Sequence, residues 1–257
     1  MNFDRSSNPA FRSEYFQSTA AAGQVMTIQG TINKIGFLML LLVASGSFTW
    51  KMALEQNMAT VQSLMYLGIF GGLITALFTT FSPRNARFSA PIYAVFEGLA
   101  LGGISGLIHL SEKSQALAKN EFALGIVSSA ILLTLATLFG MLFLYKTGIV
   151  KPTERFKAGV MSATMGVCFA YLFSFILSMF GLASPIHATG GVGIIISLVV
   201  VVIAALNLIL DFDMIVKGAD SGAPEHMEWY GAFGLLVTLV WLYLELLRLL
   251  AAMQRRD

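Results

Sequence analysis

Residues 191 to 213 read GVGIIISLVVVVIAALNLILDFD, an apolar run that ends in two acids. The charge-free region is longer still, because no Asp, Glu, Lys or Arg occurs from Ala158 to Leu210. A helix that crosses a bilayer needs about 20 mostly apolar residues at a rise of about 1.5 Å each. The stretch therefore predicts membrane helices. The acids at its end stand out because hydrocarbon makes a carboxylate costly.

The composition of the whole chain supports the same class. Of its 257 residues, 56% are apolar and only 12% are charged, and the mean hydropathy is +0.76. Soluble proteins carry roughly a quarter charged residues, so we expect an integral membrane protein. The net charge of +2 gives no basis for a nucleic-acid partner. One cysteine and three histidines exclude an internal disulfide and the usual Cys/His zinc cluster.

Seven segments are long and apolar enough to be spans, and none shows the two-residue alternation of a membrane barrel. We therefore predict an all-α membrane protein, a seven-transmembrane-helix bundle, preceded by a polar cytosolic tail over residues 1–30. The transmembrane domain then covers residues 31–257. The expected spans are Ile35–Leu54, Ser63–Phe81, Ala90–Leu110, Phe122–Tyr145, Ala158–Leu182, Gly191–Lys217 and Trp229–Ala252.

The distribution of Lys and Arg predicts the orientation. With the N-terminus in the cytosol, the inner segments hold ten basic residues and the outer segments six. Half of the outer set, Arg248, Arg255 and Arg256, lies close to the C-terminus. A last segment that dips into the membrane and returns is therefore an alternative to a seventh span.

The third expected span carries Gly98, Gly102 and Gly106 at intervals of four residues. This spacing leaves one helix face without side chains, and such faces let membrane helices approach closely. Glu97 lies about two turns inside the same span. Its carboxylate is a candidate site residue, although a bond to neighbouring backbone or hydroxyl groups would make it purely structural.

Three motifs together resemble the Bax inhibitor-1 family, also called the transmembrane Bax inhibitor motif or YccA-like family, and a bacterial subset of it. They are Phe96–Gly102, Leu210–Ile215 and Trp241–Leu250. The resemblance implies a bundle whose last helix is central, in the bacterial inner (plasma) membrane. It also implies a pH-sensitive leak of calcium across that membrane.

The resemblance assigns the gate to a carboxylate pair formed by Asp211 on the sixth helix and Glu245 on the seventh. Two such groups in a low-dielectric site share a proton and titrate together, and when ionised they suit calcium as a ligand set. Glu245 departs from the aspartate expected there. Asp213 is an acid where the family more often has an amide.

Other residues are expected to assist this pair. Asn207 lies one turn before Asp211 on the same helix face. Asp213 points away from that face and is expected to meet solvent at the cytosolic mouth. Arg248, three residues after Glu245, offers a structural alternative in which the two charges form an ion pair within one helix.

Helix geometry sets a condition on the pair. Asp211 lies near the inner end of its span, whereas Glu245 lies deep in the next one if that helix starts at Trp229. Contact between the two carboxylates is favoured if residues 225–231 lie along the membrane–water interface and the span begins near Phe233.

No phosphate loop, catalytic triad or zinc-protease motif is present, so no enzyme activity and no cofactor are expected. The expected partners are lipid, protons and calcium, the last as a permeant ion. An alternative function is a non-conducting stress regulator whose N-terminal tail binds a membrane protease or other membrane complex. A proton-coupled transporter is less supported, because the two sets of three spans show no inverted repeat.

Overall fold

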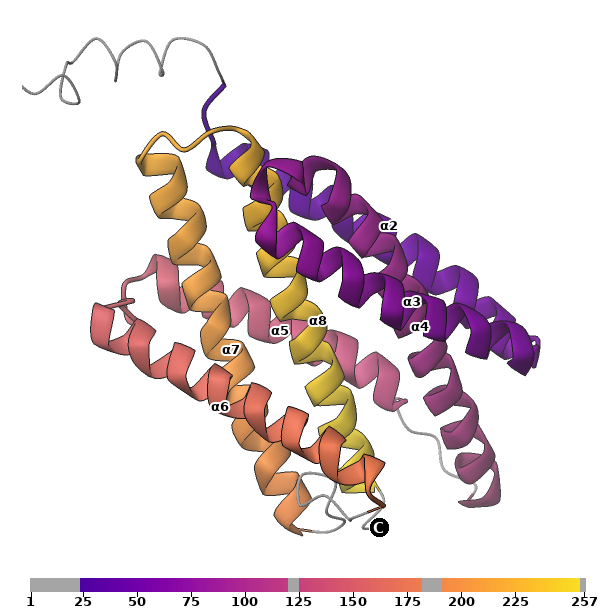
Figure 1. The fold of residues 1–257 in the computed structure, drawn as a ribbon. Coiled ribbons are helices and arrows are strands. Elements are labelled where there is room, and N and C mark those ends of the chain that lie inside the picture. The colour runs from indigo at the N-terminus through magenta and orange to yellow at the C-terminus, as the bar shows by residue number, and fades with distance from the viewer. Residues whose placement is uncertain (1–23, 120–124, 182–190, 255–257) are drawn as a thin grey trace, which may run out of the picture.

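Seven long helices make up the computed structural model, which describes residues 24–119, 125–181 and 191–254 (Figure 1). All seven are long and apolar enough to cross a membrane, which confirms the predicted fold class. A short 3₁₀ turn, η2, joins the second and third. The elements are α2 (Ile28–Leu54), α3 (Met58–Phe81), η2 (Pro83–Asn85), α4 (Ala86–Lys119), α5 (Ile126–Lys146), α6 (Glu154–Met179), α7 (Gly191–Asp220) and α8 (His226–Gln254).

The helix starts follow local capping chemistry. The side chain of Thr27 accepts a hydrogen bond from the backbone N–H of Gly30, and Asn57 and Thr153 cap α3 and α6 in the same way. The first helix therefore begins at Ile28, two turns before the predicted Ile35. Hydropathy placed the start too late because the first turns of α2 are polar, whereas the cap sets the true boundary.

The last helix occupies the centre of the bundle, as predicted. In Figure 1, α8 runs between α7 and the group formed by α2, α3 and α4, and it packs against α2, α4, α5 and α7. In the most apolar 18-residue stretch of α8, 56% of the residues are buried, whereas only 11% are buried in the corresponding stretch of α6. Leu242 and Leu247 of α8 are almost completely enclosed. Since α8 is one continuous helix, it does not dip into the membrane and return.

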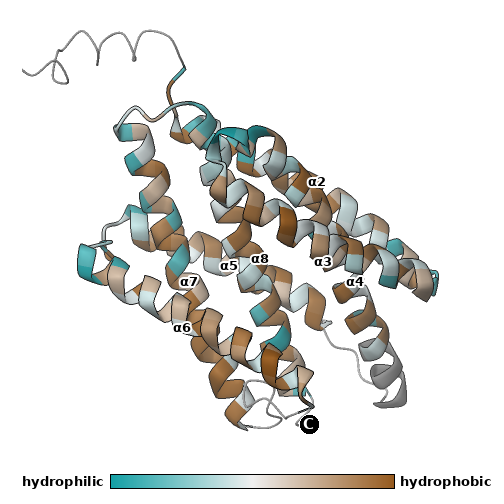
Figure 2. Ribbon diagram, in the orientation of Figure 1, coloured by the Kyte–Doolittle hydropathy of each residue, from teal (hydrophilic) through white to brown (hydrophobic). Residues whose placement is uncertain are grey.

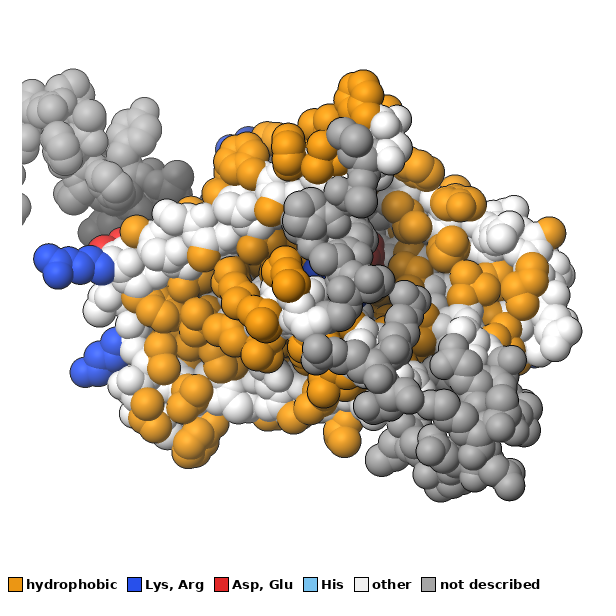
Figure 3. Space-filling model, turned by 90° about the horizontal axis from the view of Figure 1, so that it is seen from below, with side chains coloured by type: hydrophobic (Ala, Val, Ile, Leu, Met, Phe, Trp, Pro, Cys, Tyr) orange, Lys and Arg blue, Asp and Glu red, His pale blue; other side chains and the backbone are white. Residues whose placement is uncertain are grey.

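The outer surface is apolar. Seen from below, hydrophobic side chains are spread over the visible described surface, and Lys and Arg project at its edge (Figure 3). Phe81 on α3 and Phe173 on α6 are among the exposed aromatic residues. In water such a surface would favour aggregation, so it indicates contact with lipid.

The glycine face of α4 packs directly on α2, as its spacing predicted. A Cβ atom at Gly98 would collide with the carbonyl oxygen of Leu42, and one at Gly102 would collide with the carbonyl oxygen of Gly46. At Gly106 it would lie 2.6 Å from the Cβ of Ala53. The backbones of α2 and α4 can lie this close only because these three positions have no side chain.

The chain that precedes α2 is attached to the turn between α7 and α8. The N–H of Met26 donates to the carbonyl of Ala223 over 2.7 Å, and the N–H of Glu225 donates to the carbonyl of Gln24 over 2.9 Å. The end of the expected tail, residues 24–30, thus belongs to the helical fold. The rest of that tail, residues 1–23, lies outside the described residues.

Candidate functional site

Asp211 lies inside the bundle between α7 and α8. Hydrophilic positions interrupt both of these apolar helices in Figure 2. The side chain of Asp211 lies next to the Thr238 side chain on α8. Its second carboxylate oxygen, Oδ2, is buried and has no hydrogen-bond partner among the described residues. Native proteins rarely leave a buried polar atom unpartnered, so such an atom needs an explanation.

Glu245 lies further along α8 in a second polar cluster. The Tyr171 hydroxyl of α6 donates to Glu245 Oε1 over 2.5 Å. Arg248 approaches Glu245 Oε2 to 3.2 Å and also donates to the Tyr171 hydroxyl over 2.5 Å. The ion pair within α8 that the sequence offered as a structural alternative is therefore present. Even so, Glu245 Oε2 makes no hydrogen bond in the described part of the chain.

The structure does not bring Asp211 and Glu245 together. Asp211 faces Thr238, which precedes Glu245 by seven residues, or about 10 Å along the helix. The expected contact required a span that begins near Phe233, but α8 is helical from His226 onward. Glu245 therefore lies about 28 Å from the start of α8, whereas Asp211 lies about 14 Å from the end of α7. The two carboxylates occupy different levels of the bundle.

Asp213 was expected to meet solvent, and this expectation was wrong. Its carboxylate is buried, and Oδ2 lies 2.8 Å from the Nζ atoms of both Lys157 and Lys217. Lys217 is one turn away on α7, but Lys157 comes from α6. A helical wheel gives the direction of Asp213 relative to its own helix only, so it does not reveal a lysine on a neighbouring helix.

The other two expected auxiliaries also make their own contacts. Asn207 donates its side-chain amide to Thr164 Oγ1 of α6 and to the Ile203 carbonyl, each over 2.8 Å. A Cβ atom at Gly72 of α3 would lie 2.8 Å from a Glu97 carboxylate oxygen, so Glu97 faces α3 rather than α7 or α8. Glu97 therefore lies apart from both polar clusters.

No sequence motif pointed to Tyr171 and Thr238, which supply the hydroxyl groups next to the two acids. The signal for Tyr171 was available, because a tyrosine in a charge-free span has a hydroxyl that needs a partner. Thr238 gave no such signal, because a threonine hydroxyl in a helix can bond to the carbonyl four residues earlier, as this one does to Gly234.

A cavity of about 450 Å³ lies between α2, α4, α5 and α8. Its described lining contains no Asp or Glu, so neither polar cluster opens into it.

The comparison with known protein families agrees with this architecture. A family model described as Bax inhibitor 1 like matches residues 8–255. The chain belongs to this family. All three motifs that carried the resemblance lie within the matched range. No curated protein and no solved structure matched the chain.

Tyr171→Phe is expected to loosen the contact between α6 and α8. The substitution removes the donor to Glu245 Oε1 and leaves that buried oxygen unpaired, which costs about 1–3 kcal/mol of stability. Thermal unfolding in detergent measures the effect. Tyr66→Phe on the exposed face of α3 is the control. Equal melting temperatures for the two variants would show that the Tyr171 hydroxyl contributes no stability.

Proposed function

We propose that this protein is a pH-sensitive leak for calcium or a related cation, with Asp211 and Glu245 as the gating acids. The proposal is carried by one observation: each acid keeps a buried carboxylate oxygen without a hydrogen-bond partner, on adjacent helices inside an apolar bundle. Acids within membrane helices commonly mark ion pathways and proton relays. Membership of the Bax inhibitor 1 like family supports the same assignment.

The two acids, Asp211 on α7 and Glu245 on α8, act from separate levels of the bundle rather than as one pair that shares a proton. A deprotonated carboxylate attracts a hard cation such as calcium through its oxygens. Protonation removes that charge and lowers the attraction. Carboxylates at two depths provide successive binding positions, which a permeant ion needs in order to enter and leave.

Asp211 is expected to contribute more to the pH response than Glu245. Arg248 offsets the charge of Glu245 at 3.2 Å. Within the described residues no Lys, Arg or His forms an ion pair with Asp211. A change in the protonation of Asp211 therefore changes the local electrostatic potential more than the same change at Glu245, whose charge Arg248 offsets.

The experiment is calcium flux into proteoliposomes over a range of pH. Asp211→Asn is expected to flatten the pH dependence, and Glu245→Gln is expected to reduce it less. The matched controls are Asp220→Asn at the exposed end of α7 and Glu55→Gln after α2, which should keep the native profile. Unchanged profiles in both Asp211→Asn and Glu245→Gln would reject these residues as the gate. Sodium and potassium flux under the same conditions measures the ion selectivity.

We place the protein in the bacterial inner membrane with the N-terminus in the cytosol. A second candidate function is a non-conducting regulator, which is favoured by the lack of acids along the described lining of the cavity. In this case the N-terminal residues bind a membrane protease or another membrane complex. Deletion of residues 2 to 23 would then abolish partner pull-down, while the purified protein would show no flux at any pH.

A further inference from the structure

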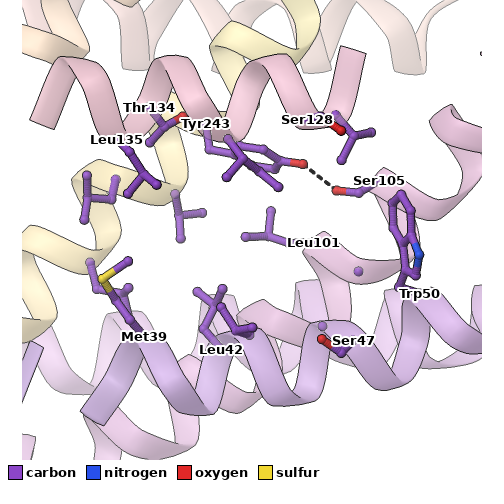
Figure 4. A pocket seen from close by; sticks show the side chains of 18 residues that line it. Met39, Leu42, Ser47, Trp50, Leu101, Ser105, Ser128, Thr134, Leu135 and Tyr243 are labelled. Carbon is purple, nitrogen blue, oxygen red and sulfur yellow. Dashed lines mark hydrogen bonds between the residues drawn. The ribbon is translucent and has the colours of Figure 1, made fainter. Parts of the chain in front are cut away.

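The cavity between α2, α4, α5 and α8 is elongated and largely apolar (Figure 4). Met39 and Trp50 of α2 lie toward its two ends, eleven residues or about 16 Å apart along the helix. Leu42, Leu101 and Leu135 line the space between them. Its volume of about 450 Å³ falls within the usual range for sites that hold small molecules, roughly 300–1,000 Å³.

One side of this cavity opens between α2 and α5. Both helices pack against α8, but they share no extensive interface with each other. At the opening, Val43 of α2 is 57% exposed and Ile131 of α5 is 49% exposed. Because the exposed faces of these helices are apolar, the opening leads to the acyl region of the bilayer rather than to water.

Polar groups gather at one end of the cavity. Ser47 of α2 and Ser128 of α5 line this end with exposed side chains, and Ser105 of α4 is hydrogen-bonded to the Tyr243 hydroxyl over 2.7 Å (Figure 4). Trp50 lies beside them, about one turn before the end of α2. Tryptophan is enriched at the level of lipid headgroups. The cavity is thus apolar along most of its length and polar toward the membrane surface.

We propose that this cavity binds the acyl chain of a membrane lipid, with the oxygen-rich head of that lipid at Ser47 and Ser128. The apolar length accommodates a hydrocarbon chain, and the two serine hydroxyls supply hydrogen bonds to ester, phosphate or carboxylate oxygens. The chain enters sideways through the opening between α2 and α5. A phospholipid and a free fatty acid share this chemistry, and the test separates them. The proposal is independent of cation conduction.

The test is photo-crosslinking of the full chain in nanodiscs, followed by peptide mapping. Two probes of equal chain length carry a diazirine in the acyl tail, one a phospholipid and the other a free fatty acid. Labelling is expected on the cavity walls, including Leu42 and Leu135, in excess over exposed positions on α3 and α6. Ser47→Phe or Ser128→Phe is expected to obstruct the opening and to lower cavity labelling about tenfold, equivalent to about 1.4 kcal/mol of binding free energy.

The controls are Ala44→Phe on α2 and Ala136→Phe on α5, which are exposed and lie outside the cavity lining. They should keep the native labelling pattern, and thermal unfolding verifies that all four variants fold. Cavity labelling by the phospholipid probe identifies a phospholipid, and labelling by the fatty-acid probe alone identifies a free fatty acid. Labelling spread evenly over all lipid-facing helices, or cavity labelling unchanged in Ser47→Phe and Ser128→Phe, would overturn the proposal.

Discussion

Gly102→Val is expected to destabilise the protein by about 3 kcal/mol or more. A Cβ atom at Gly102 collides with the carbonyl oxygen of Gly46, so the new side chain meets backbone and not the movable end of a side chain. Inserted atoms in a well-packed interior typically cost about 1–3 kcal/mol, and more when the neighbour cannot move. The two helices must therefore separate over the whole glycine face of α4. Thermal unfolding in detergent, with the yield of monodisperse protein, measures the loss.

Gly140 on α5 and Gly166 on α6 provide the controls for this prediction. Neither position has an atom within 4 Å of an added Cβ, and both lie inside apolar helices. Gly140→Val and Gly166→Val should leave the melting temperature close to that of the native chain. Similar losses at all three positions would mean that valine disturbs any helix of this protein, and that the contact between α2 and α4 is not specially tight.

Lys34→Met is expected to cost about 3 kcal/mol. Glu228 is only 5% exposed at its side chain, forms an ion pair with Lys34, and accepts hydrogen bonds from the N–H and hydroxyl of Thr27 at 2.7 and 2.9 Å. Removal of the lysine leaves a buried carboxylate without its cation, a change that typically costs about 3–5 kcal/mol. The Thr27 bonds retain part of the stabilisation, so the lower end of that range applies. Denaturation of the purified protein measures the difference.

The double variant Lys34→Met with Glu228→Gln distinguishes charge burial from lost packing. A neutral amide removes the uncompensated charge and its oxygen still accepts from Thr27, so the double variant should be more stable than Lys34→Met alone. Lys51→Met is the surface control, because Lys51 is 71% exposed and lies 3.8 Å from Glu55. Exposed pairs contribute about 0–1 kcal/mol. A loss at Lys51 as large as that at Lys34 would contradict the proposed role of the buried pair.

The predictions that held were those whose cause is local to one helix. Continuous apolar runs predicted all seven spans, and the spacing of Gly98, Gly102 and Gly106 predicted the close contact that α4 makes with α2. The ion pair between Glu245 and Arg248 could also be predicted from the sequence, because residues three apart on a helix are neighbours wherever the helix lies.

The predictions that failed depended on where two helices lie relative to each other. The expected contact between Asp211 and Glu245 assumed a late start for the last span, but α8 begins at His226 and places the acids at different depths. Asp213 was expected to meet solvent because it points away from the face of Asp211, but Lys157 of α6 and Lys217 of α7 both pair with it. The Tyr171 bond to Glu245 likewise joins α6 to α8, 74 positions apart in the chain.

The amino-acid sequence by itself determined that this chain enters a membrane as seven helices, which of its faces pack closely, and which family it resembles. These properties follow from the length, apolarity and periodicity of single segments. Only the tertiary structure decided which hydroxyl or cation each buried acid meets, and that a cavity inside the bundle opens between α2 and α5. Partner choice depends on helix depth, tilt and rotation, and these are set by the packing of all the helices together.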